Sequence, residues 1–247
     1  MKRIDRHKLK ENDFARTMER ARDLVVERQR QITALTVAIV AIVVIVGGYT
    51  WWRSSQNTHA NGALATALAV AEAPIVAPPA PAPGSAPPVQ QAGTYATERE
   101  RIDAALPRLM DVANQYPNTP AGLTARYRAA AALAQMGRYP EAEQAYQTVI
   151  DKAGRSSIYG RTARLGLGEV QVAEGKNEAA ATTFRDLSTD PNSQLPLDGI
   201  LMQLGRAYAH AGKKADATRA FTRVVDEFPQ SLYASEAKQQ IDELKKG

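Results

Sequence analysis

The residues that most often carry catalysis or hold metals are few and scattered in this chain. There is no cysteine, which excludes disulfides, thiolate nucleophiles and cysteine-ligated zinc. The three histidines, His7, His59 and His210, lie too far apart in sequence to indicate a metal site by spacing. No nucleophile elbow, phosphate-binding loop, zinc-protease or dinucleotide-binding motif occurs. The sequence therefore predicts a protein that is not an enzyme and that uses no cofactor and no metal.

The informative pattern is instead a recurring set of small and aromatic residues. Three segments align around glycines that are spaced 38 and then 37 residues apart. Each copy has a small residue seven positions before the glycine, an alanine five positions after it, and an aromatic residue four positions beyond that alanine. In chain order these residues are Ala130, Gly137, Ala142 and Tyr146; Gly168, Gly175, Ala180 and Phe184; and Gly205, Gly212, Ala217 and Phe221.

These spacings predict helical hairpins. Small residues let two helices approach closely, the aromatic ring fills the remaining gap, and the glycine adopts the left-handed conformation that ends the first helix. Residues 97–116 match the second helix of an incomplete repeat, because Pro117 follows them as Pro229 follows the last copy. Residues 61–73 are either the missing first helix or a short helix detached from the repeats.

The repeats resemble the tetratricopeptide repeat (TPR), a helical hairpin of about 34 residues. The resemblance covers residues 97–247, although Arg126, Arg164 and Leu201 occupy the usual place of a tryptophan. It implies an all-α fold, with an α-solenoid of about three and a half hairpins that binds other proteins.

A continuous apolar segment lies near the N-terminus. From Ile32 to Trp52 the chain reads ITALTVAIVAIVVIVGGYTWW, 21 residues without a charge. A helix of this length crosses a hydrocarbon core of about 30 Å. Tyr49 and Trp51 lie near its end, where aromatic rings prefer the headgroup region. We expect a single transmembrane anchor; a signal peptide cleaved near residues 63–65 is the alternative.

The distribution of charge predicts the direction of this span. Residues 1–31 hold ten Lys or Arg and six Asp or Glu, whereas residues 54–247 hold twenty of each kind. Positive flanks stay in the cytoplasm. The sequence thus predicts a single-pass protein of the bacterial cytoplasmic (inner) membrane, with a cytoplasmic N-terminus and a periplasmic C-terminal domain. A nucleic-acid-binding protein would concentrate positive charge on its folded domain, so we expect no nucleic acid partner.

The expected organisation has four parts: a basic cytoplasmic tail (1–31), a transmembrane helix (32–52), a juxtamembrane helix with a Pro/Ala-rich linker (53–96), and the repeat domain (97–247). The linker favours extended polyproline II structure without helix or sheet and is interpreted as a spacer, with an SH3-type ligand as the alternative. The tail is interpreted as a solvated extension that sets topology, and a helix that binds lipid or a partner is the other possibility.

The short basic tail, the single span ending in aromatic residues and the TPR-like hairpins together also resemble the ancillary SecYEG translocon subunit family and its single-span periplasmic relatives. This resemblance implies protein partners among translocon subunits, periplasmic chaperones or envelope-assembly factors.

Any function in the repeat domain is expected on the concave surface formed by the first helix of each hairpin. The Lys and Asn residues with which peptide-clamping TPR domains capture a C-terminal carboxylate are absent from the corresponding positions. A mixed apolar and polar groove suits helices or extended segments of a partner. By repeat position, the residues that should face this groove are Tyr127, Gln135, Leu165, Glu169, Met202 and Arg206.

The sequence therefore predicts a membrane-anchored periplasmic TPR scaffold that mediates protein–protein interactions, as an accessory factor in protein export or envelope assembly. The alternative in the same class is a self-associating, homo-oligomeric structural subunit of an envelope complex. The alternative from a different class is an enzyme with an unrecognised site, which the absence of motifs in the groove disfavours.

Overall fold

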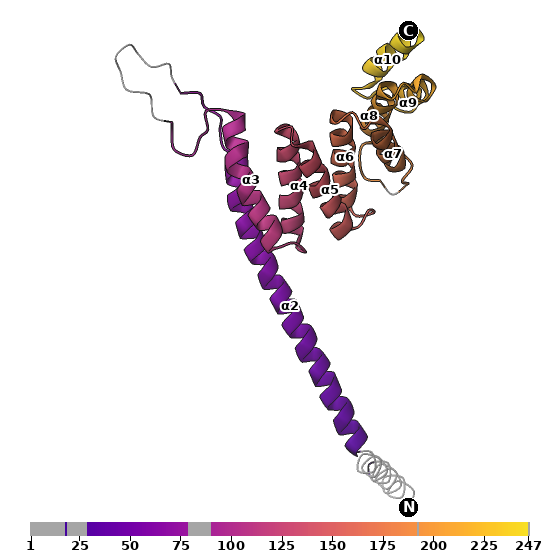
Figure 1. The fold of residues 1–247 in the computed structure, drawn as a ribbon. Coiled ribbons are helices and arrows are strands. Elements are labelled where there is room, and N and C mark those ends of the chain that lie inside the picture. The colour runs from indigo at the N-terminus through magenta and orange to yellow at the C-terminus, as the bar shows by residue number, and fades with distance from the viewer. Residues whose placement is uncertain (1–17, 19–28, 79–89, 192, 247) are drawn as a thin grey trace, which may run out of the picture. The chain divides into compact units, whose positions relative to one another are not determined.

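The structure is a computed structural model that describes residues 18, 29–78, 90–191 and 193–246, and the all-α fold is confirmed within them (Figure 1). The chain divides into two units, Met1–Ser55 and Gln56–Gly247, each described by itself. The helices are α2 (Gln29–Ala71), α3 (Glu98–Gln115), α4 (Pro120–Gln135), α5 (Tyr139–Ala153), α6 (Ile158–Ala173), α7 (Asn177–Ser188), α8 (Leu197–His210), α9 (Lys214–Glu227) and α10 (Ala234–Lys246).

The described part of the first unit consists of the beginning of α2. Its large apolar side chains from Leu35 to Trp52 are 52–76 % exposed, and α2 is the one helix among the described residues that is long and apolar enough to cross a membrane. The hydroxyls of Thr33 and Thr50 donate to backbone carbonyls of the same helix at 2.8 and 2.9 Å, which satisfies them without water. The basic tail lies largely outside the described residues.

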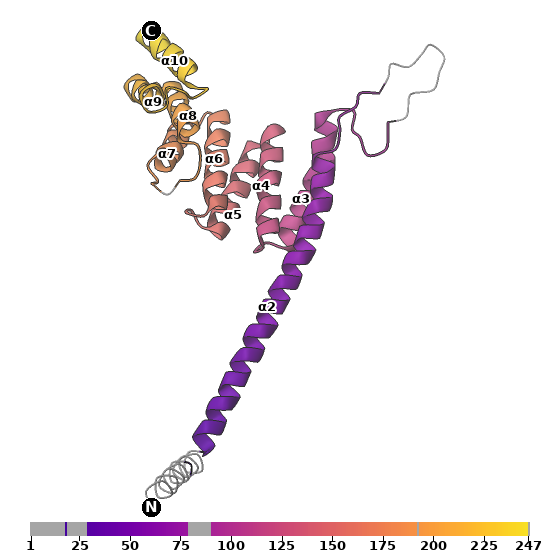
Figure 2. The ribbon, with the colours of Figure 1, turned by 180° about the vertical axis from the view of Figure 1, so that it is seen from behind.

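The second unit is a stack of helical hairpins. The α4–α5, α6–α7 and α8–α9 pairs each pack as hairpins, α10 packs on α9, and the first helices α4, α6 and α8 also contact one another in sequence. Figures 1 and 2 show α3 to α10 following one another along this stack. Such nearest-neighbour packing is typical of helical-repeat proteins.

The end of α2 completes the first hairpin. Ala67 is buried in one cluster with Ile102 and Leu106 of α3, and Leu64 and Leu68 pack against the same cluster. Of the two alternatives for residues 61–73, the structure therefore supports the missing first helix. The described part of the second unit thus contains four hairpins followed by α10, more than the expected three and a half. The domain boundaries themselves remain predictions.

The proline-rich stretch joins α2 to α3 inside the second unit. The Val76 N–H donates to the Tyr95 carbonyl at 2.9 Å, and the Tyr95 N–H donates to the Pro74 carbonyl at 3.0 Å, so that Ile75 and Tyr95 form an isolated parallel bridge. This bridge is isolated and belongs to no strand of the described residues, and it forms because residues beside the prolines keep the N–H groups that a bridge needs. The stretch connects two helices of one unit; residues 79–89 lie outside the described part.

The turn glycines adopt the predicted conformation. Gly137, Gly175 and Gly212 have φ angles of 73°, 78° and 73°. After each glycine the next N–H donates back to a carbonyl of the preceding helix, as from Arg138 to Leu133 at 2.9 Å. This bonding satisfies carbonyls that the helix end would otherwise leave open.

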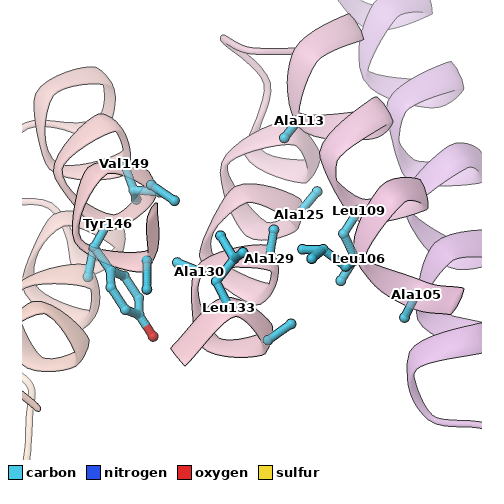
Figure 3. Close-up of a cluster of buried hydrophobic side chains, with 14 of the residues drawn as sticks. Ala105, Leu106, Leu109, Ala113, Ala125, Ala129, Ala130, Leu133, Tyr146 and Val149 are labelled. Atoms are coloured by element: carbon cyan, nitrogen blue, oxygen red, sulfur yellow. The ribbon is translucent and has the colours of Figure 1, made fainter. Parts of the chain in front are cut away.

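Small residues and aromatic rings fit together inside the hairpins. A Cβ atom added to Gly168 would lie 2.6 Å from the Phe184 ring, and one added to Gly205 would lie 2.4 Å from the Phe221 ring. In the first copy the small residue is Ala130, which has a methyl group, and the Tyr146 ring instead lies against Gly166 of α6. Figure 3 shows α4 between α3 and α5, with alanine side chains on both of its packed faces.

Candidate functional site

A hollow with a volume of about 560 Å³ lies between α4 and α6, the first helices of two consecutive hairpins. Ile158 and Tyr159, at the start of α6, are 44 % and 37 % exposed. Large apolar side chains exposed next to each other in a hollow are typical of a binding surface. The lining residues are Thr124, Tyr127 and Arg128 from α4 and Ile158, Tyr159 and Thr162 from α6.

A pair of tyrosines supports this hollow from the α4 side. The rings of Tyr127 and Tyr146 meet edge to face, with centroids 5.6 Å apart. Tyr146 is buried, and its ring occupies the space that Gly166 leaves free. Burial raises the pKa of both phenols above the ordinary value, and the charge of Glu169 adds to the rise. Both tyrosines therefore keep their protons at physiological pH, and Tyr127 presents a hydroxyl that can donate or accept a hydrogen bond.

Glu169 contributes a carboxylate to the same region. Burial raises its pKa above the ordinary value for a glutamic acid. Its charge acts on Tyr127 and Tyr146, which places the carboxylate near the tyrosine pair. Glu169 is itself exposed on α6, so its carboxylate is open to a partner that brings an N–H or O–H group.

The predicted groove residues are only partly brought together. Tyr127 lines the α4–α6 hollow, and Glu169 is exposed on α6. Gln135 is exposed at the other end of α4, where it lines a different hollow. Leu165 is half-buried and packs against the C-terminal core cluster. The role of each in binding remains a prediction.

Two predicted groove residues lie elsewhere. Met202 is 1 % exposed and belongs to the same buried cluster as Ala237 of α10, so the expectation that it faces a groove is corrected. Arg206 is half-buried, and its guanidinium donates to the carboxylate of Glu236 at 2.5 Å. The physical reason is α10, which packs on the last hairpin and provides an acidic partner where the sequence reading expected open surface.

Arg128, Ile158 and Tyr159 were not among the expected groove residues. Ile158 and Tyr159 precede the repeated core positions of α6 and directly follow Ser157, whose side chain caps that helix by accepting the Gly160 N–H at 3.0 Å. An apolar pair at a helix start, outside the repeated core positions, is the signal that could have identified them.

A family model described as the tetratricopeptide repeat-like domain matches residues 29–246, and the chain belongs to this family. Among solved structures, it is similar to the nearly identical TPR-like repeats of a putative kinesin light chain from Podosopora anserina, with 15 % identity, a TM-score of 0.51, and 60 % of this chain and 79 % of that one covered. A tetratricopeptide repeat protein from Parabacteroides merdae has 14 % identity, a TM-score of 0.50, and coverages of 60 % and 56 %. A search of curated proteins found no significant match.

At these identities the structural likeness shows the fold alone. TPR-like domains generally mediate protein–protein interactions or scaffolding, and the fold is typically non-catalytic. The hollow between α4 and α6 therefore belongs to a fold that generally mediates protein–protein interactions.

Proposed function

We propose that this protein is a membrane-anchored scaffold that binds a segment of another protein in the hollow between α4 and α6. The observation that carries the proposal is the exposure of Ile158 and Tyr159 beside Tyr127 in a hollow of about 560 Å³. Aromatic side chains provide large contact areas and hydrogen-bonding tips at low entropic cost, and they are enriched where interfaces gain most of their binding energy.

The apolar segment from Ile32 to Trp52 is the membrane anchor in this proposal. Its exposed side chains, its internally bonded threonines and the aromatic residues at its end support this role. The basic residues before it favour a cytoplasmic N-terminus, a periplasmic second unit and the bacterial inner membrane. Tethering raises the local concentration of any partner near the membrane, so that weak contacts become effective.

The process served by the scaffold is protein export or envelope assembly. The resemblance of the tail, span and hairpins to the ancillary SecYEG translocon subunit family supports this part of the proposal. Translocon subunits, periplasmic chaperones or envelope-assembly factors are the expected partners.

Photocrosslinking in intact membranes tests the binding surface. A photoreactive phenylalanine analogue replaces Tyr159 in the full chain, and the matched control carries it at Gln147, an exposed position on the second helix α5. We expect adducts with another protein from position 159 that position 147 does not give. Equal labelling from both positions, or none from either, would contradict the proposal. Adducts with a second copy of this chain would favour the self-associating scaffold instead.

The orientation requires its own experiment. A reporter enzyme that is active only outside the cytoplasm is fused to the C-terminus of the full chain. We expect activity, because the excess of Lys and Arg lies before the span. A reporter that is active only in the cytoplasm would reverse the predicted topology.

A further inference from the structure

A second hollow, with a volume of about 150 Å³, lies between the end of α2, α3 and α4. Its polar lining residues are Arg101, Arg128 and Gln135, and its other lining residues are apolar. None of the lining residues is acidic. Arg128 also lines the α4–α6 hollow, so the two hollows adjoin.

The guanidinium of Arg101 makes few and long hydrogen bonds. One terminal nitrogen donates to the Ala73 carbonyl and the other to the Glu98 carboxylate, both at 3.4 Å, which is long for such bonds. Its Nε is buried and has no hydrogen-bond partner. This Nε is closed to an incoming group, but the two terminal nitrogens can exchange their long hydrogen bonds for shorter ones to an incoming carboxylate.

The guanidinium of Arg128 is also only weakly paired and can bind an incoming carboxylate. Its nearest acid is Glu72, with 3.8 Å between the charged atoms, and both side chains are at least half exposed. Such a pair contributes little and is readily exchanged. Glu72 and Glu98 are not among the residues that line this hollow. A carboxylate that enters the hollow would thus meet two guanidinium groups, which form short, charge-assisted and often paired hydrogen bonds with carboxylates.

We infer that this basic hollow binds the side-chain carboxylate of an Asp or Glu that lies in the same protein segment as the apolar residue held between α4 and α6. The inference rests on the proposed function and adds the chemistry of the partner. Tyr127 and Gln135, which mark the two hollows, are eight positions apart on α4, about 12 Å along the helix. An extended segment covers that distance in about three or four residues.

The carboxylate belongs to a side chain rather than to a C-terminus, because the surface depression continues beyond the two arginines. A third hollow, of about 380 Å³, shares Ile102 and Gln135 with the basic hollow. A bound segment can therefore run past the two arginines and continue toward Glu98, Arg99 and Met136, the other lining residues of the third hollow.

Selection of displayed random linear peptides tests this inference on the full chain in lipid nanodiscs. We expect the selected peptides to combine a large apolar residue with an Asp or Glu about three or four positions away. The Arg101→Gln/Arg128→Gln variant should keep the apolar preference and lose the acidic one. The control Arg185→Gln/Arg219→Gln removes the same charge from exposed positions on α7 and α9 and should select as the wild type does.

Affinities of one selected peptide complete the test. Changing its acidic residue to the corresponding amide should weaken binding to the wild type by about tenfold or more. The same change should have no effect on the double arginine variant, and amidation of the peptide C-terminus should have none on the wild type. The single variant Arg128→Gln, which changes an exposed side chain, separates loss of binding from loss of folding.

The outcomes distinguish this inference from the proposed function. Selected peptides without an acidic preference, or with one that survives in the double arginine variant, overturn the inference and leave the apolar binding surface intact. The absence of any selected peptide also overturns it. The scaffold proposal is overturned by its own crosslinking experiment, if position 159 gives no protein adducts beyond those of the control position.

Discussion

Gly205 and Phe221 show at the scale of single residues why small side chains recur at one position of each hairpin. A Cβ atom on Gly205 would lie 2.4 Å from the Phe221 ring, and the ring is fully buried in the C-terminal cluster. Because protein interiors are packed as densely as organic crystals, the ring has little room to move away. The glycine is therefore required by its neighbour and not by the backbone.

We expect Gly205→Ala to destabilise the protein. Overpacking costs about 1–3 kcal/mol, whereas replacing a helical glycine returns at most about 1 kcal/mol. Gly62→Ala is the matched control, since this helical glycine has nothing within 4 Å of an added Cβ and the change should stabilise. Denaturant unfolding of the full chain in detergent measures both. A Gly205→Ala variant as stable as the wild type would show that the ring can relax.

Glu169 predicts a pH dependence with a definite sign. Burial raises its pKa in the folded state, so the folded protein holds this proton more tightly than the unfolded chain, and stability falls as pH rises through the window above the unfolded value. Glu169→Gln should therefore be more stable than the wild type near neutral pH, with a difference that vanishes toward about pH 4. Thermal unfolding across this range measures it.

The control for this prediction is Glu178→Gln. A hydrogen bond from Lys213 lowers the pKa of Glu178, so its contribution has the opposite sign and is lost as pH falls. A Glu169→Gln variant less stable than the wild type at neutral pH would mean that the carboxylate has a stabilising partner in the folded protein.

Residue spacing predicted contacts well where the repeat is regular and less well at its ends. The partners of Gly168 and Gly205 followed from the recurring small and aromatic residues. Met202 did not, because the position equivalent to Tyr127 and Leu165 is covered in the last hairpin. Spacing identifies equivalent positions in each repeat, but burial depends on what packs next to the repeat.

At the scale of elements, α6 differs from the other first helices because it carries buried polar residues beside its apolar contacts. Arg161, Arg164 and Gln171 are the buried polar residues of the second unit's described part. Arg161 donates to Asp190 at 2.8 Å, with both side chains largely buried, and Gln171 accepts a hydrogen bond from Thr183 at 3.0 Å. The α6–α7 hairpin therefore adds buried polar pairs to the apolar contact between Gly168 and Phe184.

We expect Arg161→Leu to cost about 1.5–3 kcal/mol, because it removes a charge-assisted hydrogen bond between two largely buried side chains, Arg161 and Asp190. The double variant Arg161→Leu/Asp190→Asn should recover part of this loss. The control is Arg223→Leu, whose pair with Glu227 is half exposed and should cost at most about 1 kcal/mol. Denaturant unfolding measures all three; equal losses for Arg161→Leu and Arg223→Leu would contradict the prediction.

The sequence indicated the hairpin helices but not the extent of every element. The short helix expected at 61–73 is the end of α2, since no glycine or proline after Gly62 interrupts it before Pro74. The bridge between Ile75 and Tyr95 pairs residues across the proline tract, and no local pattern encodes such a pairing. Element type follows from local spacing, whereas long-range pairing depends on how the chain folds back.

At the scale of the whole molecule, the two units bury their apolar residues differently. The buried clusters of the second unit are formed by Ala67 and later residues, together with partly buried residues from Ala63 onward. The large apolar side chains from Leu35 to Trp52 lie exposed and join neither cluster. Folding of the hairpins and anchoring by the apolar segment can thus be separated by substitution.

Val40→Arg/Val43→Arg should release the protein from membranes while leaving the hairpins folded. Each charge near the centre of a span costs about 2.5–3.5 kcal/mol of insertion free energy, and both side chains are exposed on α2. Alkaline carbonate extraction measures release, and circular dichroism of the released protein measures the hairpins. Val40→Leu/Val43→Leu is the control and should stay in the membrane. The buried clusters of the second unit contain none of the described apolar side chains of this segment. If the arginine variant also stayed in the membrane, residues 32–52 would not be the anchor.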